Sequence, residues 1–383
     1  MSRMLSRRSA HEALYNDLFL ALAHKRARHE PVIDLTVSNP TQADIPYERD
    51  AIFRALQDPR VFEYEPEPFG APHARSAAAA TLGAPASRVV LTASTSEAYS
   101  VLFKLLCDPD DEVLVPQPSY PLFDYLAQFE GVRLTPYRLL YDGAWHIDLD
   151  SVRRGIGSKT RAIIVVNPNN PTGNYVKRDE LYALAEHGLP IISDEVFVPY
   201  SLRPDMNRVT CAQSVDAELV FSLSGLSKVA GLPQMKAAWM AIGGREERVI
   251  EVLERMELML DSYLSVSAPI QHGLAQLLKA GKFTQRAILD RIAYNYTFAK
   301  SGLEGSAATL LDSEGGWYAN IRLPKNAPET AICIQLLDDF NVYVYPGHFF
   351  DFWDEPVTVV SLLTPKTDFA QGIAAIRDLA GQL

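Results

Sequence analysis

The stretch RAIIVVNPNNPTG, residues 161–173, passes directly from a run of apolar residues into a polar turn. The segments PIISDEVF, residues 190–197, and ELVFSLSGLSK, residues 218–228, follow the same pattern. A short apolar run without polar alternation is typical of a strand that is buried on both faces of a parallel sheet. These segments therefore predict neighbouring buried strands with polar groups at their carboxyl ends.

Seven β-rich runs lie between about residues 88 and 242, namely RVVLT, EVLV, VRLTPY, RAIIVV, PIIS, ELVFSL and KAAWMAI. Most are separated by helix-length segments, which predicts an α/β fold with a three-layer domain and a mostly parallel seven-stranded sheet. We expect this large domain to span residues 40–260. Residues 1–39 and 261–383, with the runs WYANIRLP, NVYVYP and TVVSLL, are expected to form a smaller α+β domain. A predicted helix over residues 244–264 would connect the two.

The composition is that of an acidic globular chain. Its 383 residues include 36 Lys and Arg against 47 Asp and Glu, which gives a formal net charge of −11. This charge argues against nucleic acid as a partner, and the length is sufficient for two hydrophobic cores. Cys107, Cys211 and Cys333 are far apart and form no CxxC pair, so neither a disulfide framework nor a metal site is expected.

The N-terminal segment does not resemble a membrane signal. Its apolar patch LFLALA, residues 18–23, is shorter than the central part of a signal peptide, and no run approaches the length of a membrane span. Glu12 and Asp17 interrupt the basic start that a transit peptide would need. We therefore expect a cytoplasmic protein that does not associate with membranes.

Polar residues follow four of the predicted strands. They are Ser94, Thr95 and Ser96, then residues 167–170, then Asp194, and finally Lys228. Turns use the same residue types, so each group alone has a structural explanation. Because the carboxyl ends of parallel strands form the ligand-binding edge of open α/β sheets, all four groups would face one crevice.

Six short motifs extend this pattern. They are YEPEPFG at 64–70, TASTSEA at 92–98, PSYP at 118–121, NPNNPTG at 167–173, SDEVF at 193–197 and SGLSKVAGLP at 224–233. With these motifs the chain resembles the fold-type I pyridoxal-phosphate enzymes, specifically the class I/II aminotransferase family, over roughly residues 34–365. The resemblance implies the aminotransferase fold type I, pyridoxal 5′-phosphate as cofactor, no metal, and a homodimer.

The resemblance also implies roles for the four polar groups. Lys228 would hold the cofactor as a Schiff base, and Asp194 would keep its pyridine nitrogen protonated. The helix start at Ser94, Thr95 and Ser96 would bind the cofactor phosphate through hydroxyl and backbone N–H groups.

Four further residues are expected at the cofactor by the same resemblance. Asn170 would bind the phenolic oxygen, and Tyr120 would lie against the ring face. Ser227 stands beside the lysine, and Tyr64 would reach the phosphate in the neighbouring subunit of the homodimer.

The chain departs from the family pattern at three positions. Lys236 replaces an arginine that grips the phosphate, and Phe197 replaces a tyrosine that donates to the phenolic oxygen. Val359 stands where an arginine usually pairs with the substrate carboxylate. Asn39 and Arg322 are the substrate-binding candidates that remain. The resemblance also places the aromatic segment YPGHFFDFW, residues 345–353, near the substrate mouth, although hydrophobic packing explains its composition equally well.

The function implied is a pyridoxal-phosphate-dependent aminotransferase that moves an amino group from a small amino donor to an oxo acceptor by a ping-pong mechanism. Val359 keeps open a lyase or decarboxylase on the same fold. A non-catalytic ligand-sensing domain fits less well, because the chain is acidic and retains Lys228 and Asp194.

Overall fold

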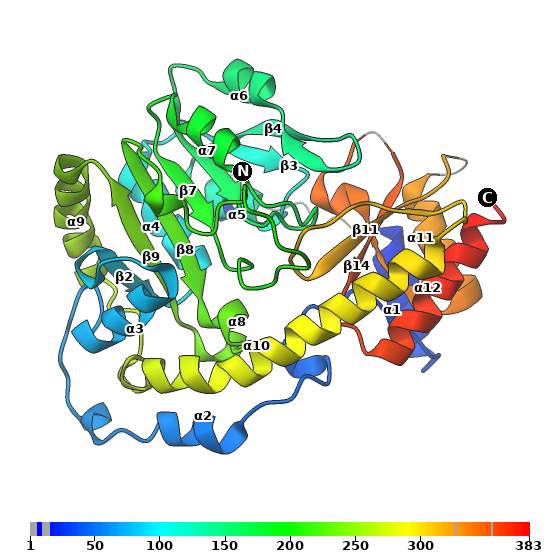
Figure 1. The fold of residues 1–383 in the computed structure, drawn as a ribbon, viewed down its shortest axis with the longest axis horizontal. Coiled ribbons are helices and arrows are strands. Elements are labelled where there is room, and N and C mark those ends of the chain that lie inside the picture. The colour runs from blue at the N-terminus through cyan, green and yellow to red at the C-terminus, as the bar shows by residue number, and fades with distance from the viewer. Residues whose placement is uncertain (1–5, 10–15, 326–327, 354) are drawn as a thin grey trace.

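The computed structural model describes residues 6–9, 16–325, 328–353 and 355–383. Residues 1–5 and 10–15 of the N-terminal segment, which belong to the predicted small domain and include Glu12, lie outside the described residues. A large sheet with helices on both faces lies at one end of the molecule and a smaller sheet at the other (Figure 1).

The large sheet has eight strands within the described part of the chain, in the order β2-β9-β8-β7-β6-β3-β4-β5. Their bounds are β2 Val89–Thr92, β3 Glu112–Gln117, β4 Arg133–Tyr141, β5 Trp145–Ile147, β6 Thr160–Val166, β7 Ile191–Asp194, β8 Leu219–Gly225 and β9 Ala238–Gly244. All seven predicted strands are present, and the mostly parallel α/β fold is confirmed. The three-residue β5, too short to be recognised in the sequence, adds an eighth strand antiparallel to β4.

The strand directions bring the predicted polar groups to one edge. The strands from β8 to β4 are parallel, whereas β9 is antiparallel to both β8 and β2. Because β9 runs opposite to β8 and β2 runs opposite to β9, β2 runs in the same direction as β8 and ends at the same edge of the sheet. This edge therefore receives the carboxyl ends of β2, β3, β6, β7 and β8 together with the start of β9.

Helices cover both faces of the large sheet, as the three-layer prediction requires. The segments are α2 Arg49–Ala55, α3 Pro72–Leu82, α4 Thr95–Leu106, α5 Leu122–Glu130, α6 Leu149–Gly155, α7 Arg178–Ala185, α8 Leu226–Val229 and α9 Glu246–Asp261. On one face, α4 and α9 bury Leu102, Phe103 and Met256 against strand residues such as Ile164 and Met240. The helix predicted over 244–264 is thus α9, but it packs on the sheet, and its expected connecting role is wrong.

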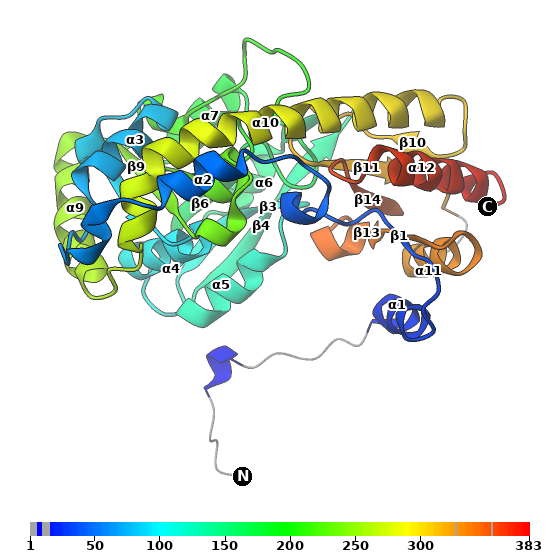
Figure 2. The same ribbon diagram turned by 90° about the horizontal axis from the view of Figure 1, so that it is seen from below.

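The connecting element is α10, Ala268–Leu303. It packs against α2 and α3 at one end and α12 at the other, and it runs past both sheets (Figure 2). A side chain at Gly281 of α10 would place its Cβ 2.3 Å from that of Ala230, just after Lys228. This glycine lets the helix lie close beneath the turn that carries Lys228.

The smaller sheet has the order β10-β11-β14-β13 and is antiparallel. The elements around it are α1 Asp17–Ala27, β1 Ile33–Asp34, β10 Thr309–Leu310, β11 Tyr318–Arg322, α11 Glu329–Phe340, β12 Val342–Tyr343, β13 Tyr345–Pro346, β14 Val357–Ser361 and α12 Lys366–Ala380. Its core packs α1, α10, α11 and α12 around β11 and β14. The domain bounds at residues 40 and 260 stay a prediction.

Candidate active site

A cavity of about 1290 Å³ lies at the carboxyl edge of the large sheet, between it and the smaller sheet. Ten of the predicted site residues line it: Ser94, Thr95, Ser96, Tyr120, Asn170, Asp194, Phe197, Ser227, Lys228 and Lys236. Nine of them lie at or just after the carboxyl ends of five strands and Lys236 lies just before β9, so the topology of the sheet is what brings them together.

Lys228 and Asp194 are the charged pair of this cavity. Lys228 lies in α8, directly after β8, and Asp194 is the last residue of β7 beside it. Burial lowers the pKa of the Lys228 ammonium to about 8 and raises the pKa of the Asp194 carboxyl to about 6, and the attraction between the two charges opposes each shift. At neutral pH Asp194 is therefore mostly ionised, and an appreciable fraction of Lys228 is neutral near pH 8.

The Asp194 carboxylate is oriented by two donors. Tyr99 of α4 donates its hydroxyl to Oδ2 at 3.3 Å, and the backbone N–H of Val196 donates to Oδ1 at 3.3 Å. Tyr99 is not among the predicted site residues, although it lies one helical turn after Thr95 and therefore on the same face. A carboxylate held in this way suits the N–H group of a protonated pyridine ring.

The amine of Lys228 lies among aromatic rings. Its Nζ is 4.7 Å from the centre of the Trp317 ring and 5.4 Å from that of Phe197, and these two rings meet edge to face. Tyr200 donates its hydroxyl to the backbone carbonyl of Lys228 and packs on Trp317. Trp317 and Tyr200 thus fix the position of the lysine, and only Phe197 among the three was predicted.

The start of α4 lines the cavity with groups that are suited to an anion. Ser94 caps the helix by accepting the N–H of Glu97 on its Oγ at 3.1 Å, while Thr95 and Ser96 line the cavity in the first turn. The free backbone N–H groups and positive end of the helix dipole favour a phosphate here. Lys236, which precedes β9, adds a cation to the same cavity.

Lys236 adopts a left-handed backbone conformation, with φ of 49° and ψ of 59°.

We expect Lys236→Ala to weaken binding of pyridoxal phosphate by about 10- to 100-fold, because a charge-assisted hydrogen bond to the phosphate would be lost. Lys236→Arg should bind at least as tightly as the wild type. Absorbance titration of the cofactor-free protein measures both, with the exposed Lys300→Ala as control. An unchanged Kd in Lys236→Ala would contradict the assignment.

An unpaired polar atom of Asn170 is a further sign that the cavity residues fit pyridoxal phosphate. Asn170 is 7% exposed and lines the cavity, yet its Oδ1 has no hydrogen-bond partner among the described residues. Such an unpaired buried amide is costly unless a ligand completes its contacts. Together with an amine, an ionised carboxylate and a helix start, it matches the groups of the cofactor.

Three predicted residues do not line this cavity. Tyr64 is 81% exposed, and Asn39 uses its Oδ1 to accept from the backbone N–H and hydroxyl of Thr41. Arg322 pairs with Glu355 and lies in another cavity of about 480 Å³. These placements argue against the substrate roles expected for Asn39 and Arg322.

Val359 occupies the position where the family pattern has an arginine. In β14 it pairs with Tyr345 of β13 and Asn320 of β11 and is fully buried. Directly opposed residues on neighbouring strands point to the same face, so Val359 lies on the side of Tyr345, which lines the cavity. The valine leaves that side without a cation.

Eight more residues, from α1, the smaller sheet and the segments beside them, line the cavity. They are Asn16, Phe19, Ser38, Tyr318, Tyr345, His348, Phe349 and Phe350. The last four belong to the aromatic segment 345–353, which the family resemblance places near the substrate mouth. The others come from segments whose approach depends on tertiary packing.

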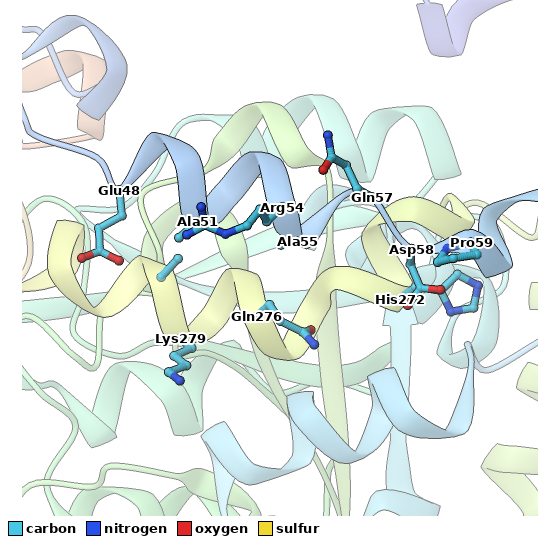
Figure 3. A pocket seen from close by; sticks show the side chains of 11 residues that line it. Glu48, Ala51, Arg54, Ala55, Gln57, Asp58, Pro59, His272, Gln276 and Lys279 are labelled. Atoms are coloured by element: carbon cyan, nitrogen blue, oxygen red, sulfur yellow. The ribbon is translucent and has the colours of Figure 1, made fainter.

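Another hollow, of about 370 Å³, lies between α2 and α10 (Figure 3). Its side chains include Asp58, His272 and Lys279, and none of the predicted site residues lines it. Asp58 is paired with Arg60. No group of three or more His, Cys, Asp or Glu that could hold a metal ion occurs among the residues the structure describes.

Comparison with solved structures supports the fold. An alanine aminotransferase of Pyrococcus furiosus matches with a TM-score of 0.85 and 24% identity, over 99% of this chain and 100% of the other. An aspartate aminotransferase single mutant of Thermus thermophilus matches with a TM-score of 0.84 and 21% identity, over 99% and 100%.

Curated relatives match over shorter stretches. A glutamate-pyruvate aminotransferase of Haemophilus influenzae is 28% identical over 201 residues, 51% of this chain and 50% of the relative. An S-alkyl-thiohydroximate lyase of Arabidopsis thaliana is 30% identical over 197 residues, 50% and 42%. An alanine aminotransferase of Mycobacterium tuberculosis is 30% identical over 192 residues, 49% and 44%. The chain spans about half the length of the curated relatives that it matches.

The family described as aminotransferase class I and II matches residues 30–367, which include every strand of both sheets and every predicted site residue. The chain therefore belongs to the class I and II aminotransferase family.

Proposed function

We propose that this protein is an aminotransferase that moves an amino group from an amino acid or amine to an oxo acid by a ping-pong mechanism. Members of its family use pyridoxal phosphate. The observation that carries the proposal is the Lys228–Asp194 pair, with opposite pKa shifts, facing one cavity beside the α4 helix start.

Each residue has a separate task in this proposal. Bound pyridoxal phosphate supplies an electron sink for negative charge at the substrate Cα. Asp194 would accept a hydrogen bond from the ring nitrogen, and Asn170 and Tyr120 would hold the ring in place. Lys228 would hold the cofactor through its Nζ, and once the substrate amine has displaced it, the freed Nζ would carry the proton to and from Cα.

A half-reaction assay tests this function. The cofactor-loaded protein is mixed with single amino donors, without an acceptor, and its visible absorbance is recorded. We expect stoichiometric conversion to the pyridoxamine form, with one oxo acid released per site, and reversal on adding an oxo acid. A protein that binds the cofactor but converts none of the twenty amino acids or common amines would contradict the proposal.

Elimination or decarboxylation is the second candidate function, because one relative is named a lyase and Val359 removes the expected carboxylate anchor. The same assay separates the three reactions. Catalytic release of ammonia and an oxo acid without an acceptor supports elimination, and release of carbon dioxide supports decarboxylation. Absence of cofactor binding would favour the sensing domain.

The proposal includes a homodimer in which Tyr64 completes the neighbouring site. Its support is the exposure of two aromatic side chains in one segment, Phe62 at 92% and Tyr64 at 81%. Light scattering should give twice the mass of one chain.

None of the described helices is long and apolar enough to cross a membrane. The cytoplasmic location stays a prediction.

A further inference from the structure

The substrate end of the cavity has a single basic side chain among the described residues. Lys228 and Lys236 are assigned to the cofactor, and no arginine of the described ranges lines the cavity. The remaining basic residue is His348 in the short segment Gly347–Phe350, which follows β13 directly. It therefore lies three residues beyond Tyr345, which is the strand partner of Val359.

His348 is held by Glu329 of α11. The Glu329 Oε2 accepts the backbone N–H of His348 at 2.9 Å and lies 2.7 Å from its ring Nδ1. The other oxygen, Oε1, accepts the N–H of Val357 at 2.7 Å, so this carboxylate joins α11 to the segment and to β14. With both oxygens used and its side chain 13% exposed, Glu329 is a fixed support.

This support determines which ring nitrogen is available. With Nδ1–H donated to Glu329, Nε2 is left for a ligand, and a protonated ring donates from both nitrogens. The His348 side chain is 45% exposed and packs edge to face on Phe349. When the ring is protonated, its Nε2–H at the cavity wall is a suitable partner for one carboxylate group.

The surrounding wall is aromatic. Phe349 stacks on Phe19 of α1 with ring centres 5.5 Å apart, and Tyr345 contacts both Phe349 and Phe350. All four rings line the cavity. An apolar side chain fits against them, whereas a second carboxylate would find no further basic group among the described lining residues apart from the two lysines assigned to the cofactor.

We propose, as an extension of the proposed function, that His348 Nε2 binds the carboxylate of the amino donor and that Glu329 is its positioning residue. The preferred donor is an amino acid with one carboxylate and an apolar side chain. Such a donor places its carboxylate on His348 and its side chain on the aromatic wall.

Equilibrium binding to the cofactor-loaded protein tests the proposal without turnover. The probes are 3-phenylpropanoate, its uncharged amide, and glutarate, with affinities measured by calorimetry. His348→Asn keeps a donor near the Nδ1 position and removes Nε2. We expect it to weaken 3-phenylpropanoate by about 10- to 100-fold, the range of a charged hydrogen bond, and to change the amide by less than about twofold.

Two more variants make the test specific. His146→Asn is the matched control. The His146 side chain is similarly exposed at 43%, its Nδ1 lies 3.8 Å from Asp142 Oδ1, and it lines the cavity of about 480 Å³ that contains Arg322. Its affinities should equal those of the wild type. His348→Gln, with a neutral donor near the Nε2 position, should recover part of the loss. Glu329→Gln should raise KM for the best amino acid while leaving kcat within about threefold, since it acts through His348.

Clear outcomes overturn the proposal. Unchanged acid affinity in His348→Asn, or equal losses for acid and amide, would remove His348 from carboxylate binding. Tighter wild-type binding of glutarate than of 3-phenylpropanoate would reject the single-carboxylate class. If no amino donor converts the cofactor although acid binding depends on His348, the proposed function fails and the anion site stands.

Discussion

Lys228→Ala is expected to lower kcat by at least about 10⁴-fold, because both the covalent attachment of the cofactor and the proton carrier at Cα are lost. Borohydride treatment followed by mass spectrometry of peptides should show cofactor bound to Lys228 in the wild type and no attachment in the variant. Lys300→Ala, which replaces an exposed lysine, should match the wild type in both measurements.

The loss should not come from unfolding. Lys228 is a desolvated amine whose pKa is lowered by burial, so the folded state gains little from its charge. The cofactor-free variant is therefore expected to unfold at a temperature close to that of the wild type. A variant that retains more than about 1% of kcat, or that still carries cofactor on the residue 224–233 peptide, would exclude the assigned role of Lys228.

Much of the site could be predicted because apolar runs and polar turns are local features. Residues 161–173 identify both a buried strand and the turn that follows it, and the same holds for Asp194 and Lys228. The shared edge then follows from parallel pairing. The reversed insertion of β9 between β2 and β8 could not be predicted, since seven apolar runs are compatible with many strand orders.

Contacts between distant elements account for what the sequence analysis missed. Trp317 reaches the Lys228 amine from the residue before β11, and Phe19 reaches the cavity from α1, both far from Lys228 in sequence. The placement of Arg322 also depends on tertiary packing. It shares a strand face with Tyr318, which lines the cavity, but it lies four positions further along β11, about 13 Å away. That distance takes the arginine to Glu355 and the other cavity.

Asp194→Asn is expected to lower kcat by about 10³-fold, within the range seen when a group that supports proton transfer is removed. An amide cannot hold the positive charge on the ring nitrogen. Glu195→Gln is the matched control. Glu195 is also a buried carboxylate at the end of β7, but it lines a different cavity, of about 590 Å³, which Lys228 does not line. Steady-state kinetics at saturating cofactor should show at most a threefold loss for this control. Comparable losses in both variants would mean that any change at this strand end impairs the enzyme.

The same substitution should stabilise the cofactor-free protein, in a pH-dependent way. The folded-state pKa of Asp194 is about 6, above its ordinary value of 3.8, so the native state binds this proton more tightly than the unfolded state. As pH rises from about 4 to 6, the unfolded state releases the proton first, and the free energy of unfolding of the wild type falls; above 6 the fall ends. Asp194→Asn lacks this contribution, so its advantage over the wild type should be small at pH 4, grow to pH 6 and then remain constant. Urea denaturation at several pH values measures this difference, and an advantage that is largest at pH 4 would contradict the raised pKa. A residue that costs stability while it is needed for activity is selected for its chemistry, and this sign of the stability change would distinguish Asp194 from a structural aspartate.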